Sequence, residues 1–221
     1  MSIIEHLVLF KVKDDVAPSE IDAMVDRMNS LVSLEQVLHL TAGPLLRIQS
    51  SPSLSFTHFL HCRYNSKDDF HAYAVHPTHV AVVKANDPFC DDAMALDFVA
   101  EDLQGGLVPP PGSAMQVTFF KLKEGLGDQV KDEVLGAIRG IQQEFKQAIQ
   151  LTCGENFSPG RAHGFSIASL AVFPGLSELE AADSNEEIGN YKKNEMIKEH
   201  LESVMVLDYI VPSPKARSAS C

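Results

Sequence analysis

The chain has 221 residues and a formal net charge of −12, with 45% hydrophobic and 22% charged residues. This composition is ordinary for a globular protein that buries a core, and the length allows one large domain or two of about a hundred residues. Both halves are acidic, which disfavours binding to nucleic acid and to anionic membrane surfaces.

The four cysteines are far apart and form no pattern typical of a metal site or a disulfide framework. We therefore expect no metal site and a cytoplasmic location, or an organelle if a precursor segment has been removed. No apolar run approaches the roughly twenty residues of a membrane span. Charges interrupt residues 1–13, which does not fit a signal peptide.

Alternating hydrophobicity predicts a first strand over residues 3–12, with His6, Val8 and Phe10 on one face. Both faces are largely apolar, so we expect this strand to be covered on both sides. A helix is predicted to open at Pro18, because an apolar stripe of helical spacing follows it.

A second strand is predicted within residues 36–48, a loop over 49–53 and a third strand over 54–64. Alternation along the third strand places His58 and His61 on opposite faces. We expect His61, and His71 further along the chain, to lie at the surface.

The next segment combines histidines with a proline. Ser66 is a candidate N-cap for a helix that begins at Lys67 and carries Tyr73. Proline cannot continue a helix without losing a hydrogen bond, but it suits a first turn. We therefore predict a kink or restart at His76-Pro77, with His79 in the following segment.

A fourth strand over residues 93–100 completes the order β-α-β-β-α-β of a ferredoxin-like unit. Helices cover one face of such a sheet, and the other face must be buried on something else. We expect this unit to span residues 1–103. Residues 104–114 contain three consecutive prolines and are predicted to be an extended linker.

The second half repeats the first. Phe-Lys-Val-Lys at 10–13 matches Phe-Lys-Leu-Lys at 120–123, and Met-Ala-Leu-Asp-Phe-Val at 94–99 matches Met-Val-Leu-Asp-Tyr-Ile at 205–210. Nearly equal offsets indicate a duplication. The second unit is expected at 115–211 and a tail at 212–221, with the elements of the unit as strands at 115–123, 163–173 and 203–211 and helices at 127–148 and 177–200.

The two copies differ in chemistry. At an offset of 110, His6 corresponds to Gln116, and at an offset of 109, His79 corresponds to Ile188. Any site built from these histidines should therefore belong to the first half alone.

Three stretches, Glu5–Lys11, Phe56–Phe59 and above all Tyr73–His79, resemble the stress-responsive A/B barrel family of plant proteins, also called the dimeric α/β barrel (Dabb) family. The resemblance implies an α+β fold in which two ferredoxin-like units pair into one closed barrel. In this tandem chain the pair would form within the chain as a pseudo-dimer. A further homodimer of such barrels stays open as an alternative.

The resemblance also implies chemistry. Some relatives are polyketide cyclases that need no cofactor, and the matching positions would make His79 the base and Tyr73 the hydroxyl donor. His6, His58 and His76 would then bind ligand in the same cavity. Magnesium occurs in relatives near the end of the first helix, but the corresponding stretch here departs from their pattern, so no magnesium site is assigned.

Two functions follow. The favoured one is a stress- or defence-related protein that binds a small hydrophobic ligand in the cavity of the first half. The alternative is a cofactor-independent cyclase or lyase of the aldol type. Each residue also has a structural interpretation: His76 caps or hinges a helix, whereas His6, His58 and Tyr73 are core residues.

Overall fold

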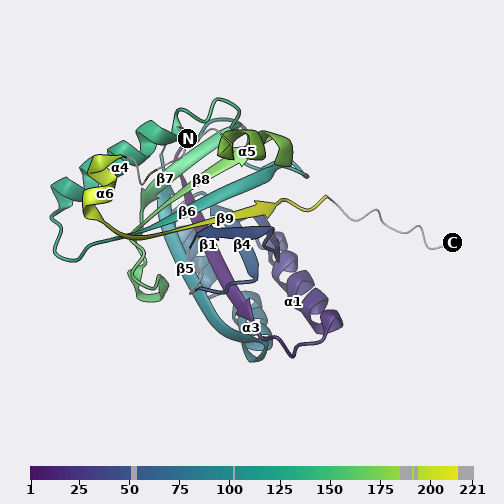
Figure 1. Ribbon diagram of the computed structural model, residues 1–221. Helices are drawn as coiled ribbons and strands as arrows, with labels where there is room; N and C mark the ends of the chain where they lie inside the picture. Colours follow the sequence, from purple (N-terminus) through teal and green to yellow (C-terminus); the bar gives the residue numbers. More distant parts are fainter. Residues whose placement is uncertain (51–53, 102, 185–190, 192–193, 214–221) are drawn as a thin grey trace.

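The computed structural model describes residues 1–50, 54–101, 103–184, 191 and 194–213. It contains two ferredoxin-like sheets, one of four strands and one of five, with their helices on the outside (Figure 1). Residues 214–221 of the predicted tail, residue 102 at the end of the first predicted unit, and the middle of the helix predicted at 177–200 lie outside the described part.

The first sheet has the strand order β2-β4-β1-β5. Each strand of this sheet is antiparallel to its neighbours, with β1 in the centre beside β4 and β5. Its strands are β1 (Ile3–Val12), β2 (Val37–Pro44), β4 (His58–Tyr64) and β5 (Cys90–Ala100), and its helices are α1 (Pro18–Ser30), α2 (Lys67–Ala74) and α3 (Pro77–Asn86).

The second sheet has the order β9-β6-β8-β7, and a short strand of the first half, β3, extends it at β9. Its strands are β3 (Arg47–Ser50), β6 (Ala114–Leu122), β7 (Gln150–Glu155), β8 (Ile167–Phe173) and β9 (Leu201–Ile210), and its helices are α4 (Asp128–Gln142), α5 (Leu176–Asp183) and α6 (Glu195–His200).

The helix break around the proline is confirmed. Ser66 caps α2, and its hydroxyl accepts a hydrogen bond from the amide of Asp69. Helix α2 ends at Ala74, and α3 restarts at Pro77 with His76 as its N-cap. The local chemistry of serine and proline is sufficient to predict these helix boundaries, because an N-cap and a missing backbone amide each act within one helical turn.

Several predicted boundaries are wrong. The third strand begins only at His58, α4 ends at Gln142, and β8 begins at Ile167. Strand β7 is absent from the prediction, since it is short and rich in polar residues. Residues 49 and 50, predicted as loop, belong to β3, whose partner β9 lies in the other half and is not visible in the local pattern.

The two sheets close into one barrel through two seams related by pseudo-symmetry. At one seam the amide of Leu46 donates to the carbonyl oxygen of Asp208 at 2.9 Å. At the other seam the amide of Phe157 donates to the carbonyl oxygen of Asp97, also at 2.9 Å. The two donors, Leu46 and Phe157, are 111 residues apart, and so are the two acceptors, Asp97 and Asp208. The repeat in the sequence is therefore also a repeat in the barrel.

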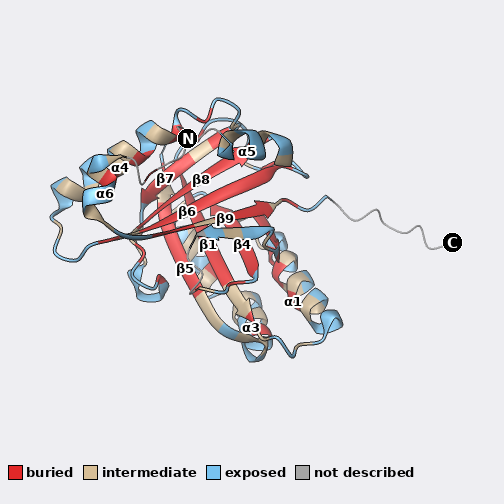
Figure 2. Ribbon diagram, viewed as in Figure 1, coloured by how far each residue is buried: buried red, intermediate tan, exposed pale blue. Residues whose placement is uncertain are grey.

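The closed barrel buries the bare face of each sheet on the other. Strands are red along most of their length in Figure 2, whereas the helices expose their outer sides. Residues of both halves form one apolar core inside the barrel, including Leu7, Phe59, Met94, Phe119, Leu170 and Leu207. Between the first sheet and its helices lies a separate cluster that includes Met24, Met28 and Tyr73.

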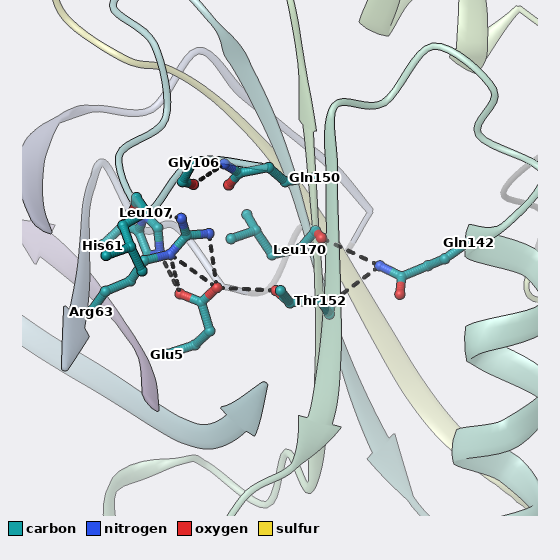
Figure 3. A network of polar contacts seen from close by, with 9 residues as sticks. All are labelled: Glu5, His61, Arg63, Gly106, Leu107, Gln142, Gln150, Thr152 and Leu170. Carbon is teal, nitrogen blue, oxygen red and sulfur yellow. Dashed lines mark hydrogen bonds and ion pairs between the residues drawn. The ribbon is translucent and has the colours of Figure 1, made fainter. Parts of the chain in front are cut away.

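A charged network sits inside this apolar barrel (Figure 3). Glu5 is fully buried and accepts hydrogen bonds from Arg63 at 2.9 Å and from the hydroxyl of Thr152 at 3.2 Å. Its carboxylate also bonds to Nε2 of His61 at 2.6 Å. Arg63 lowers the pKa of Glu5 to about 2, against the effect of burial. The network spans both halves, because Thr152 belongs to β7.

The expectation that His61 lies at the surface is wrong. Its side chain is fully buried in the barrel, where it pairs with Glu5. Alternation places it correctly on the face opposite His58, but that face is the barrel interior. The expectation that His71 lies at the surface is confirmed.

The linker covers one end of the network. Arg63 donates through Nη1 to the carbonyl oxygen of Leu107 at 2.8 Å, and the side-chain amide of Gln150 bonds to the carbonyl oxygen of Gly106. The linker is therefore attached to both halves rather than being a free spacer.

Replacing Arg63 by methionine should strongly destabilise the barrel, since it leaves the Glu5 carboxylate buried without its cation. We expect a loss of about 3–5 kcal/mol in the free energy of unfolding, measured by urea denaturation. Combining Glu5→Gln with Arg63→Met should restore part of this loss, because no unpaired charge is then buried. A loss below about 1 kcal/mol for Arg63→Met would show that the pair contributes little.

Acid should destabilise the fold through His39, whose ring lies 5.1 Å from that of His61. Burial, with nearby positive charge, lowers the pKa of His39 to about 3. The folded state therefore resists protonation that the unfolded state accepts below about pH 6.5. Between these two pKa values, His39 alone should lower the free energy of unfolding by about 1.4 kcal/mol for each unit by which the pH falls.

The comparison of wild type with His39→Leu isolates this contribution. Denaturant titrations from about pH 7 down to about pH 5 should show a smaller loss of stability in the variant. If the free energy of unfolding falls equally steeply with pH in the two proteins, the assignment to His39 is contradicted.

Candidate functional site

A cavity of about 420 Å³ lies between the helix-facing side of the first sheet and the helices α1, α2 and α3. Alternate residues of β1 and β5 form its floor, since the opposite residues of the same strands face the barrel interior. The lining is mainly apolar, and its polar and charged members include His6, Tyr73, His79, Asp87, Asp97 and Arg161.

His6 is held on the cavity floor by Asp97. The two residues are direct neighbours on β1 and β5, and His6 Nδ1 bonds to the Asp97 carboxylate. Asp97 is itself fixed from the second half, because its amide donates to the side chain of Asn156 at 3.2 Å. Because Nδ1 is bonded to Asp97, Nε2 is the ring nitrogen of His6 that determines whether the ring donates or accepts a hydrogen bond toward the cavity.

An aromatic cluster forms one wall. The ring of His6 lies 5.4 Å from that of Phe70 and 6.4 Å from that of Tyr73. Tyr73 in turn lies against His79, with ring centroids 4.3 Å apart. Helix α2 supplies Phe70 and Tyr73, and the break before Pro77 turns the chain so that His79 of α3 faces back onto Tyr73.

His79 is oriented by the backbone. Its Nδ1 lies 3.0 Å from the carbonyl oxygen of Ala74. A carbonyl only accepts, so Nδ1 carries the proton and Nε2 is left with a lone pair. Burial lowers the pKa of His79 and raises that of Tyr73. At neutral pH the site therefore holds a neutral imidazole next to a protonated phenol.

The structure brings His6, Tyr73 and His79 together, but not the other two predicted residues. His76 is the N-cap of α3, and its Nδ1 accepts from the amide of Thr78 at 3.2 Å. His58 is buried and its ring bonds to the hydroxyl of Thr57 at 2.9 Å. Among the described residues, neither of these two lines the cavity.

Sequence reasoning missed the residues that complete the site. Asp97 stands in the repeated motif at 94–99, and its position opposite His6 was the available signal. Residues 158–161, which line one side of the cavity, come from the second half and carry no local signal.

The corresponding place in the second half is an open hollow of about 470 Å³ that is lined by polar and charged side chains. Gln116, the counterpart of His6, donates to Asp183 at 2.8 Å, and Arg47 pairs with Asp183 and Asp208. Gln49 donates to Asp208 at 2.8 Å. Burial raises the pKa of Asp208 despite these donors. The scaffold is thus repeated, whereas the chemistry is not.

The described residues contain no group of three or more His, Cys, Asp or Glu side chains that could hold a metal ion. Within the same part of the chain, no helix has the length and apolar character needed to cross a membrane.

Comparison with known proteins agrees with the tandem repeat of the fold. The sequence profile of the stress responsive A/B barrel domain matches residues 4–100 and again residues 115–211. The chain is 47% identical over 218 residues to a stress-response A/B barrel domain-containing protein of Arabidopsis thaliana, covering 98% of this chain and 82% of that protein. It is 42% identical over 213 residues to a second protein of the same description from the same plant, covering 96% and 98%.

Solved structures share the whole fold at low sequence identity. A candidate monooxygenase from Fusobacterium nucleatum superposes with a TM-score of 0.66 at 15% identity, over 96% of this chain and 93% of that one. An anthrone oxidase-like protein gives 0.65 at 14% identity, over 99% and 97%. At these identities the likeness concerns the fold alone.

Proposed function

The chain belongs to the stress responsive A/B barrel domain family, and from this premise we propose that its first half binds a small hydrophobic molecule in a stress- or defence-related role. The observation that supports the proposal is the apolar cavity between the first sheet and its helices. Its volume of about 420 Å³ falls in the range of about 300–1,000 Å³ found for small-molecule sites.

The lining favours an apolar body with few polar contacts. Each carbon of a ligand buried there would contribute about 0.8 kcal/mol. The apolar lining residues include Val8, Met28, Leu31, Leu60, Val82 and Ala95. His6 and His79 provide polar contacts that would fix the orientation of the ligand.

The proposal implies one ligand per chain. The counterpart of this cavity in the second half is made polar by Arg47 and the two carboxylates with which it pairs, Asp183 and Asp208. An apolar molecule that displaced Arg47 would leave the Asp208 carboxylate buried without its cation, which is unfavourable.

Filling part of the cavity should weaken this binding. Ala93 lines the cavity from β5, and Ala93→Leu would exclude about three carbons of ligand, weakening binding roughly tenfold or more. The neutral fluorophore N-phenyl-1-naphthylamine should bind the wild-type protein with a stoichiometry of one, measured by fluorescence titration.

The matched control is Val204→Leu, at the corresponding position of the second half (93 + 111 = 204). Its binding should equal that of wild type. Equal weakening by both variants, or binding unaffected by Ala93→Leu, would contradict the proposed location of the site.

A second candidate is a cofactor-independent cyclase or lyase of the aldol type. The specific observation in its favour is the contact between His79 and Tyr73, with Nδ1 of His79 bonded to Ala74. Imidazole Nε2 can take a proton from the carbon next to a carbonyl, and a phenol can donate to the enolate oxygen. The resulting carbanion would attack a second carbonyl of the same molecule, forming a carbon–carbon bond, and the new alkoxide would take up the proton.

The cyclase candidate predicts that His79→Gln and Tyr73→Phe lose turnover while keeping affinity. With a linear poly-β-keto acyl thioester as substrate, His79→Gln should reduce kcat by about 10²–10⁴, since a positioned base contributes that factor. Product formation would be followed by the absorbance of the aromatic ring, which forms when the aldol product loses water and enolises. Since the pKa of His79 is lowered, the acid limb of the kcat profile should lie below about pH 6.5.

Thermal unfolding of both variants provides the control for folding. If wild type binds such a thioester but does not convert it, or if His79→Gln turns over like wild type, the cyclase candidate fails and ligand binding alone stands.

A further inference from the structure

One side of the cavity is built by the second half of the chain. The segment from Ser158 to Arg161 follows β7 and reaches across the seam to the first half, where its residues line the cavity. The short helical turn Pro159–Arg161 presents Arg161 there. The site is therefore incomplete without the second half, although the histidines belong to the first.

Contacts on both sides of this segment hold it in place. Before it, the amide of Phe157 bonds to Asp97 at 2.9 Å, and the ammonium group of Lys67 lies 4.3 Å from the centre of the Phe157 ring. After it, Nε2 of His163 lies 3.4 Å from the carboxylate of Asp92. Arg161 is thus positioned at the cavity by contacts made by its neighbours.

In the part of the chain that the structure describes, the guanidinium of Arg161 has no hydrogen-bond or ion-pair partner. It is also the sole Lys or Arg among the described lining residues. Arg161 is exposed at the edge of the cavity, where water can satisfy its guanidinium. A ligand carboxylate could replace that water and form two parallel hydrogen bonds with the guanidinium.

The other charged residues that line the cavity do not neutralise the positive charge of Arg161. Asp97 is bonded to His6. Asp87 follows the last residue of α3, about 12 Å along the helix from His79, and it forms no ion pair with Arg161. Arg161 lines the same cavity as His79, and its charge adds to the effect of burial in lowering the pKa of His79.

We propose that Arg161 selects ligands with an anionic head group, a carboxylate above all, whose apolar tail fills the cavity beside His79 and Tyr73. The inference rests on the proposed binding function and names the class of its ligand: an amphipathic acid. The net charge of −12 would repel such a ligand at long range, so the preference depends on this local cation.

The test compares two ligands with the same tail, decanoate and 1-decanol, by displacement of N-phenyl-1-naphthylamine at about pH 7.5, where the carboxylic acid is ionised. Wild type should bind decanoate about tenfold more tightly than 1-decanol, and Arg161→Gln should lose this preference while binding 1-decanol as before. Arg161→Lys should keep part of it, since the charge remains but the planar fork is lost. High salt should reduce the preference in wild type and leave Arg161→Gln unaffected.

Lys146→Gln is the matched control, because it removes one positive charge from a side chain that is 75% exposed and does not line the cavity. It should retain the wild-type preference. Equal affinity of wild type for both ligands, or a preference that survives Arg161→Gln, would overturn the role of Arg161 and leave hydrophobic binding intact. Failure of both ligands and of the fluorophore to bind wild type would instead refute the binding function itself.

Discussion

The bare face of each ferredoxin-like sheet is the constraint on which the rest of the molecule depends. Helices cover only one side of each sheet, and the inward residues of both halves are apolar along most of their length. Exposing such a surface costs about 25 cal/mol for each Å² of apolar area. Pairing the sheets removes that cost, and the tandem arrangement makes the pairing intramolecular, so its strength does not depend on protein concentration.

The buried network around Glu5 makes the pairing specific rather than merely apolar. A carboxylate and a guanidinium inside a barrel are costly unless their partners are in place. Those partners come from β4, from β7 of the other half, and from the linker, as Figure 3 shows for Arg63, Thr152 and Leu107. A displaced register between the sheets would leave several of these groups unsatisfied.

The two faces of each strand have different roles, and this explains how one half could keep a site while the other half lost it. Inward residues hold the barrel, and outward residues face the helices. His6 on β1 and Gln116 on β6 are both outward, so changes there do not disturb the interface between the sheets. The second half therefore keeps its barrel face, while Arg47 and its partners make the place that corresponds to the cavity polar and charged.

The sequence by itself determined the elements that rest on local chemistry: the cap at Ser66, the restart at Pro77, the alternation along β1, and the repeat that puts the histidines in one half. It also identified His6, Tyr73 and His79, which line one cavity. The tertiary structure alone decided which strand face is interior, and so placed His61 beside Glu5. It also decided the pairing of β3 with β9 and the arrival of Arg161 from the other half. The physical reason is that period and capping act within a few residues, whereas partners such as Glu5 and Thr152 are 147 residues apart and meet only when the barrel closes.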